Sequence, residues 1–176
     1  MNITIVYDSI FGNTALVAKA VAAELEREHH VTVATVQEAK KLELSGTDLL
    51  VVGSPTRGFQ PTPQIAEYLA GLGPIPSGMV GAVFDTRLDL ETVNPLPLRW
   101  VMDIGGYAAA RMASALQRHG IELRGDQGDF RVTNAEGPLK EGEIGRAREW
   151  AISLMKPGRP DLPDDQATPT GQGTPS

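Results

Sequence analysis

The sequence contains no cysteine, and aromatic residues make up only 5% of it. The absence of cysteine excludes disulfides, thiolate zinc sites, cysteine-bound iron–sulfur clusters and cysteine nucleophiles. If this chain carries out redox chemistry, it needs a bound organic cofactor to do so.

The chain also has fewer basic than acidic residues: 16 Lys and Arg against 22 Asp and Glu, which gives a net charge of −6. This balance disfavours a phosphate-backbone partner, so we expect no nucleic-acid binding. No apolar run approaches the roughly 18 residues of a membrane span, and strand-like sequence begins at Asn2. We therefore expect a cytoplasmic protein without a membrane span.

Metal ligands are scarce as well. His29 and His30 form a pair at the end of a predicted helix, where imidazolium favours the helix dipole, and no second ligand cluster accompanies them. We predict no metal site.

Apolar segments alternate with helical patterns along the chain, which is the rhythm of an α/β domain. Val17, Val21 and Leu25 share one face of a helix predicted over 14–27, and a closing helix is predicted over 140–156. The predicted strands are 3–7, 31–36, 48–53, 79–84, and a fifth drawn from 121–124 together with 130–133.

The apolar patterns also predict the order of the strands. Residues 3–7, 49–52 and 79–84 are nearly continuously apolar, as in strands buried on both faces, whereas 31–33 and 130–132 alternate, as edge strands do. We therefore predict a doubly wound parallel sheet in the order 2-1-3-4-5, with a ligand beyond the carboxyl ends of strands 1, 3 and 4.

One domain is expected over 1–156. From Pro157 onward five prolines prevent regular structure, so we predict a disordered tail over 157–176. Residues 88–104 form a long connection, in which 95–100 are a candidate flap that carries Trp100.

The strongest signal lies between the first strand and the first helix. Free backbone N–H groups and the helix dipole attract an anion there, and Gly12 lets the backbone approach it closely. The loop has no Lys or Arg, which suits a single phosphate monoester better than a triphosphate. The alternative is that its polar residues only cap the helix. The candidate phosphate-binding residues are Ser9, Ile10, Phe11, Gly12, Asn13 and Thr14.

These residues resemble a family signature. The run Ile5-Val6-Tyr7-Asp8-Ser9, followed by Gly12, Thr14, Ala18 and Val21, is similar to the N-terminal signature of the flavodoxin family. The resemblance implies a flavodoxin-like three-layer sandwich with a five-stranded parallel sheet, which binds flavin mononucleotide (FMN) on three loops. It also makes the capping-only interpretation the weaker one.

The resemblance implies a second flavin loop after strand three, composed of Pro55, Thr56, Arg57, Gly58 and Phe59. Phe59 either covers one face of the flavin ring or lies in the core. In flavodoxins a glycine in this loop can turn its peptide to accept a hydrogen bond from the reduced flavin N5, and Gly58 is the candidate here.

A third loop, Asp85, Thr86 and Arg87, follows strand four, where the family contacts the pyrimidine edge of the flavin through backbone groups. Trp100 is the candidate for the aromatic that stacks on the ring. Positive charge on Arg57, Arg87 and Arg99 predicts a second-electron potential less negative than that of a low-potential flavodoxin, unless these side chains point into water.

A phospho-acceptor receiver domain of the same topology is excluded. Such a domain needs an acidic cluster after strand one and an acceptor Asp after strand three, but Asp8 stands alone and Gly53-Ser54 occupies the second place.

The resemblance therefore implies an electron carrier of the short-chain type, because only residues 125–129 separate the halves of strand five. Its expected partners are a flavodoxin or ferredoxin reductase and an acceptor, and no catalytic side chain is required. The alternative is an NAD(P)H-dependent FMN or quinone reductase, in which 88–104 would frame a substrate pocket. A third possibility is an interaction module that has lost its flavin.

Overall fold

The computed structural model describes residues 1–89 and 107–156. The predicted tail (157–176), most of the predicted 88–104 connection, Arg99 and Trp100 lie outside these residues. None of the described helices is long and apolar enough to cross a membrane.

Strands and helices alternate as the sequence predicts. The strands are β1 (Asn2–Tyr7), β2 (His30–Thr35), β3 (Leu49–Pro55), β4 (Val80–Leu88), β5 (Glu122–Leu123) and β6 (Gly128–Val132). The helices are α1 (Asn13–Leu25), α2 (Val36–Ala39), α3 (Pro63–Ala70), α5 (Ala108–Arg118) and α6 (Glu143–Met155).

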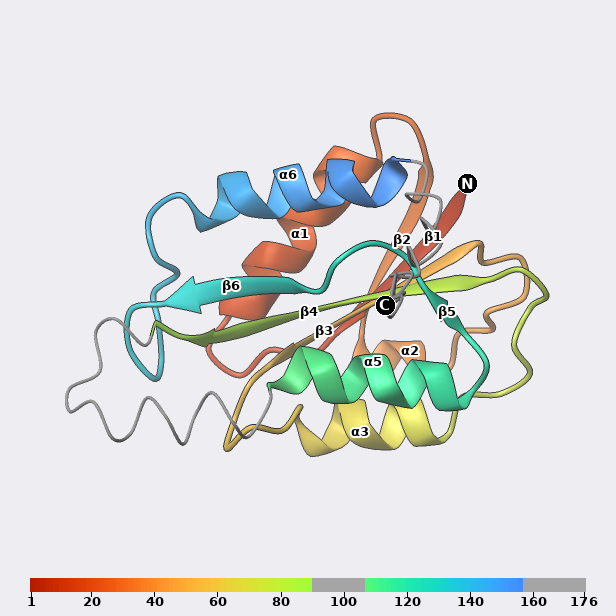
Figure 1. Cartoon of the computed structure of the whole chain (residues 1–176), viewed down its shortest axis with the longest axis horizontal. Coiled ribbons are helices and arrows are strands. Elements are labelled where there is room, and N and C mark those ends of the chain that lie inside the picture. The colour runs from red at the N-terminus through yellow and green to blue at the C-terminus, as the bar shows by residue number, and fades with distance from the viewer. Residues whose placement is uncertain (90–106, 157–176) are drawn as a thin grey trace, which may run out of the picture.

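All strand pairs of the sheet are parallel, and its order is β2-β1-β3-β4-β5, with β6 also paired to β4 (Figure 1). The predicted order 2-1-3-4-5 is therefore confirmed. β5 and β6 are the two halves of the predicted fifth strand, since Glu122 lies opposite Val80 and Gly128 opposite Phe84. The residues between the halves loop out of the sheet, and the Trp150 indole N–H donates to the Asp126 carbonyl there at 2.8 Å.

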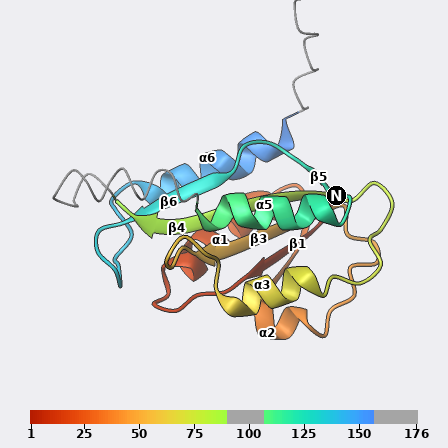
Figure 2. The same cartoon turned by 60° about the horizontal axis from the view of Figure 1, so that its bottom comes forward.

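Helices cover both faces of the sheet, with α1 and α6 on one side and α2, α3 and α5 on the other (Figures 1 and 2). Successive residues of a strand point to opposite faces of the sheet, so alternate residues pack against different helices. Ile3 and Ile5 belong to the core under α1 and α6, whereas Val6 belongs to the core under the other three helices. Two separate apolar cores therefore hold the central strands in register.

The edge strand β2 is mostly exposed, and it ends one residue earlier than predicted. Thr35 closes it by capping α2: its hydroxyl accepts a hydrogen bond from the Glu38 N–H, and the Glu38 carboxylate accepts one from the Thr35 N–H. This capping box draws Val36 into a short helix.

The largest departure from the sequence prediction is the length of β4. The strand continues four residues beyond Phe84 to Leu88, because β3 pairs with it as far as Thr86 and β6 pairs with residues 84–88. Asp85, Thr86 and Arg87 are consequently strand residues, and the prediction that they form a loop after strand four is wrong.

Candidate functional site

A cavity of about 250 Å³ opens at the carboxyl ends of β1, β3 and β4, where the strand order predicts a ligand. It is lined by residues from all three predicted segments, including Thr14, Gly58 and Thr86. Ten of the fourteen predicted site residues line it. The four that do not are Ser9, Gly12, Phe59 and Asp85.

The backbone between β1 and α1 forms one end of this cavity. Gly12 precedes the helix at φ +88° and, as a glycine, offers no side chain to cap it. In this segment the backbone N–H groups of Ser9, Ala15 and Leu16 donate hydrogen bonds. The N–H groups of residues 10–14, which lie between them, have no acceptor among the described residues. A helix start with unsatisfied N–H groups is suited to bind a phosphate.

The predicted polar donors of this loop are already hydrogen-bonded. The Ser9 hydroxyl accepts from the Ala15 N–H at 3.2 Å, and the Asn13 amide donates to the Glu136 carbonyl at 2.9 Å. The Thr14 hydroxyl shares a buried hydrogen bond of 2.8 Å with Thr86. Each still has a proton to offer: Ser9 keeps its own, Asn13 keeps one amide proton, and two paired threonine hydroxyls use only one of their two.

The segment between β6 and α6 also contributes to the site, and sequence reasoning missed it. Val132 and Ala135 line the cavity, and Glu136 holds Asn13. Gly137, at φ +111°, lies so close to Asn13 that a Cβ would come within 2.5 Å of its amide nitrogen. The sequence offered one indication of this contribution: the second half of the predicted fifth strand ends at the same edge of the sheet as β4, so the segment that follows it lies near the cavity.

The second predicted segment forms a two-residue hairpin. Arg57 and Gln60 exchange two backbone hydrogen bonds of 3.0 Å, and the two residues between them have positive φ, 52° at Gly58 and 65° at Phe59. Phe59 is the one non-glycine residue with positive φ in the described chain. Its side chain is half-buried and belongs to neither of the two main cores, so the alternative that it lies in the core does not hold, and a position over the flavin ring stays a prediction.

At the mouth of the cavity the Arg57 guanidinium lies over the Phe11 ring, 5.7 Å from its centroid. Phe11 is 47% exposed and its neighbour Ile10 is 48% exposed. Two loops that are distant in sequence therefore present an apolar and cationic rim beside the cavity.

Asp85 is fully buried in the carboxyl-terminal half of β4 and accepts three hydrogen bonds from two groups. Its carboxylate accepts two hydrogen bonds from Arg87, at 2.6 and 2.8 Å, and one from the Ala109 N–H at 2.9 Å. The Arg87 guanidinium also lies 3.7 Å from the centroid of the Tyr107 ring. The positive charge predicted for Arg87 is thus compensated by Asp85, while Thr86 points to the opposite face and bonds Thr14.

We expect Arg87→Met to lower the free energy of unfolding by about 3 to 5 kcal/mol, because it leaves the buried Asp85 carboxylate without its cation. Urea denaturation measures the loss. The double variant Asp85→Asn, Arg87→Met should recover at least half of it, since no buried charge then remains. A single variant as stable as the native chain would show that the pair is not what holds this end of β4.

Comparisons with known proteins agree with this architecture. The model of the flavodoxin family matches residues 5–71, which include the first two predicted loops. A search of curated proteins finds no match.

Among solved structures, oxidised flavodoxin 2 from Bacillus cereus is similar over 88% of this chain and 97% of its own, with 21% identity and a TM-score of 0.65. A flavodoxin from the domain Archaea covers 88% of this chain and 96% of its own, with 17% identity and a TM-score of 0.62. The rubredoxin:oxygen oxidoreductase of Desulfovibrio gigas is similar over 87% of this chain, with 20% identity and a TM-score of 0.64, and the match spans only 35% of that protein.

The fold is therefore flavodoxin-like, and the resemblance predicted from the N-terminal residues is confirmed by the family match. Proteins of the flavodoxin family bind FMN, so the cofactor predicted from the sequence is the one that this family uses.

Proposed function

We propose that this flavodoxin-like chain binds FMN in the 250 Å³ cavity and carries one or two electrons between redox partner proteins. The observation that supports this most directly is the first loop, whose unsatisfied N–H groups face a cavity that also meets the Arg57–Gln60 hairpin and the end of β4. When bound, the flavin supplies the redox chemistry. The protein supplies binding, orientation and charge.

The residues present fit the phosphate end of FMN. Backbone N–H groups of residues 10–14 would donate to the phosphate oxygens, assisted by the spare hydroxyl protons of Ser9 and of the Thr14–Thr86 pair. No cationic side chain belongs to this loop, so the dianion is held by dipoles and hydroxyls. Arg57 at the cavity mouth adds positive charge near the ring end.

The hairpin provides a peptide that can turn. With both central residues at positive φ, the turn resembles type I′, in which Phe59 is strained. Rotating the Gly58–Phe59 peptide gives a type II′ turn, where the first position suits glycine and Phe59 returns to negative φ. The Gly58 carbonyl could thereby reorient to accept a hydrogen bond from the N5–H of a reduced flavin, as the family resemblance implies.

Gly58→Ala should narrow the gap between the first and second midpoint potentials by about 60 mV or more, because alanine is strongly disfavoured at the first position of a type II′ turn. A redox titration measures the two potentials. Gly46→Ala is the matched control, since Gly46 also has positive φ, at 81°, with open space around it but lies outside the cavity. If the difference between the two midpoint potentials is unchanged in the Gly58 variant, the Gly58 carbonyl does not stabilise the one-electron-reduced flavin.

Thr14→Val should weaken FMN binding about tenfold, because it removes the hydroxyl at the start of α1 and leaves the Thr86 hydroxyl without the partner that orients it. Fluorescence titration of the apoprotein with FMN measures the dissociation constant. Thr47→Val is the control: it breaks an equivalent buried hydroxyl pair, Thr4–Thr47 at 3.0 Å, before β3 and outside the cavity. Equal effects of the two variants would mean that general destabilisation, not phosphate binding, is being measured.

The function itself is tested by the visible spectrum of the purified protein, followed by addition of NADPH with and without a quinone. A carrier should show flavin bands that NADPH alone does not bleach, because it depends on a partner reductase for electrons. Direct bleaching and quinone turnover would identify a reductase instead. A colourless protein that FMN cannot reconstitute would refute the proposal.

A further inference from the structure

The strand β2 forms one edge of the sheet, and among the described residues it pairs only with β1. The pairing runs from Asn2 opposite His30 to Tyr7 opposite Thr35 without a bulge. In the described part of the chain no strand lies along the other side of β2. An uncovered edge of this kind presents backbone N–H and C=O groups to which another strand can bind.

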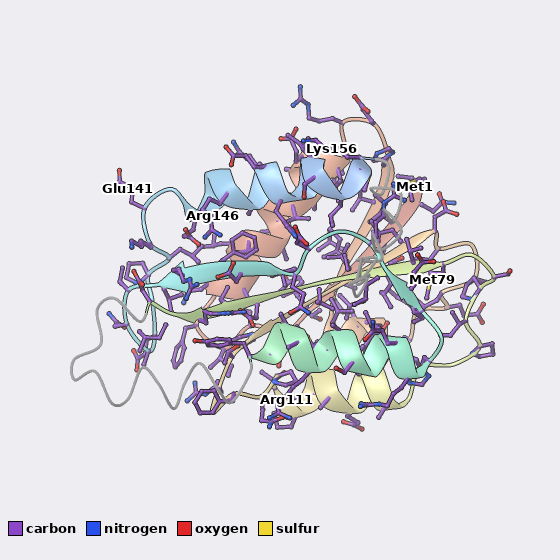
Figure 3. The ribbon with its side chains drawn as sticks, viewed as in Figure 1. Met1, Met79, Arg111, Glu141, Arg146 and Lys156 are labelled. Carbon is purple, nitrogen blue, oxygen red and sulfur yellow. The ribbon has the colours of Figure 1, made fainter. Side chains whose placement is uncertain are left out.

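One hydrogen bond shows which backbone groups of β2 point outward. The His30 N–H donates to the carbonyl of Met1, the residue labelled in Figure 3 that precedes β1, at 3.1 Å. The backbone groups of successive strand residues point to alternate sides, so Thr32 also faces β1, whereas Val31 and Val33 face away from it. The N–H and C=O groups of these two valines have no hydrogen-bond partner among the described residues. Four backbone groups are therefore open on this edge.

The open stretch is closed at both ends by bonds within the chain. On one side the next outward N–H, that of Thr35, donates to the Glu38 carboxylate at 2.8 Å. On the other side the His29 N–H donates to the Leu25 carbonyl at 3.0 Å. Only residues 31–33 are left for a further strand, so the register of any strand that binds here is narrowly defined.

This stretch is complementary to itself. When two β2 strands run antiparallel about a twofold axis at Thr32, Val31 of each copy lies opposite Val33 of the other, and each such pair exchanges two N–H···O=C hydrogen bonds. All four open groups of each chain are then used. Placing either valine opposite itself uses fewer, because the other valine then meets His29 or Thr35, whose N–H groups are already bonded.

The side chains of β2 also suit a second copy. The strand contains no Lys, Arg, Asp, Glu or Pro, the residues that commonly prevent pairing between sheet edges. Each chain has a net charge of −6, yet the two chains would meet where neither has a carboxylate. Val33 is 37% exposed, and self-pairing covers it with Val31, while Thr32 meets Thr32; β-branched pairs of this kind stabilise neighbouring strands.

We propose that the β2 edge binds the β2 edge of a second copy of this chain, which joins the two sheets into one in a twofold-symmetric dimer. Residues 31–33 alone make a contact well below the roughly 1,200 Å² of a standard interface, so the dimer is reversible. The 250 Å³ cavity lies at the carboxyl ends of β1, β3 and β4, and no residue of β2 lines it. Antiparallel pairing therefore leaves both cavities open, and the dimer does not depend on the proposed flavin.

The first test uses the absence of cysteine, which lets a single introduced thiol report the register. In the proposed dimer the two Thr32 Cα atoms lie about 4.5 Å apart, within the range of a disulfide, whereas the two Val33 Cα atoms lie roughly 8 to 9 Å apart, beyond it. Oxidised glutathione serves as the oxidant: two thiols become one disulfide, and the glutathione takes up their two electrons and two protons. Thr32→Cys in the full-length chain should form a covalent dimer about tenfold faster than Val33→Cys, with or without FMN.

The control is Ile152→Cys, whose site on α6 is 48% exposed, and it measures cross-linking by random collision. It should form covalent dimers as slowly as Val33→Cys. Equal rates for all three variants would show that collision alone is measured, and faster cross-linking of Val33→Cys would show another register. Either result, or no covalent dimer from Thr32→Cys, would overturn the proposal.

The second test is sedimentation equilibrium of the native full-length chain from about 10 µM to about 1 mM, where we expect a reversible monomer–dimer equilibrium. Val33→Lys should weaken dimerisation about tenfold or more, because a charged side chain at this edge opposes pairing. Ile152→Lys adds the same charge at an exposed apolar position on α6 and should leave the equilibrium unchanged. A native chain that stays monomeric throughout, or a dimer that both lysine variants weaken equally, would contradict the proposal.

Discussion

The arrangement of the site depends on one buried carboxylate, that of Asp85 in the carboxyl-terminal half of β4. It fixes Arg87 on its own strand and the Ala109 N–H at the start of α5. The first turn of α5 then holds the hairpin segment, through the Ala108 N–H on the Thr56 hydroxyl and Arg111 on the Phe59 carbonyl. A single charged group, removed from water, therefore connects the strand, the helix and the hairpin, and its removal from water makes the compensating guanidinium necessary.

The other side of the sheet is held by neutral hydrogen bonds. Thr86, next to Asp85 but on the opposite face, bonds Thr14 in the first turn of α1. Asn13 bonds the segment after β6, where Gly137 leaves room for it. The first loop is therefore held by hydroxyl and amide pairs that retain donors for a ligand, while the charged network lies on the α5 side. The loop itself contains no cationic side chain, whereas Arg57 lines the cavity from the hairpin and Arg87 pairs with Asp85.

Much of the architecture could be predicted from the chain. The continuous apolar runs of β1 and β3 and the alternating pattern of β2 predict the sheet order, because burial on two faces or one leaves a direct imprint on sequence. The position of the first loop was predictable for a similarly local reason, since the strand, the glycine and the helix are adjacent in sequence. Asp85, Thr86 and Arg87 were misassigned to a loop because their polarity is typical of a turn. They are strand residues because β3 pairs with Asp85 and Thr86 and because β6, more than forty residues away, pairs with all three.

The sequence by itself determined the family resemblance, the parallel α/β fold and the position of the first loop, because these follow from short-range patterns of apolar and small residues. Only the tertiary structure decided which charged side chains are paired with one another or stacked on aromatic rings. It paired Arg87 with Asp85 and set Arg57 against Phe11. Ion pairs and grooves depend on residues brought together from distant strands and helices, and the spacing of residues along a chain carries no record of those contacts.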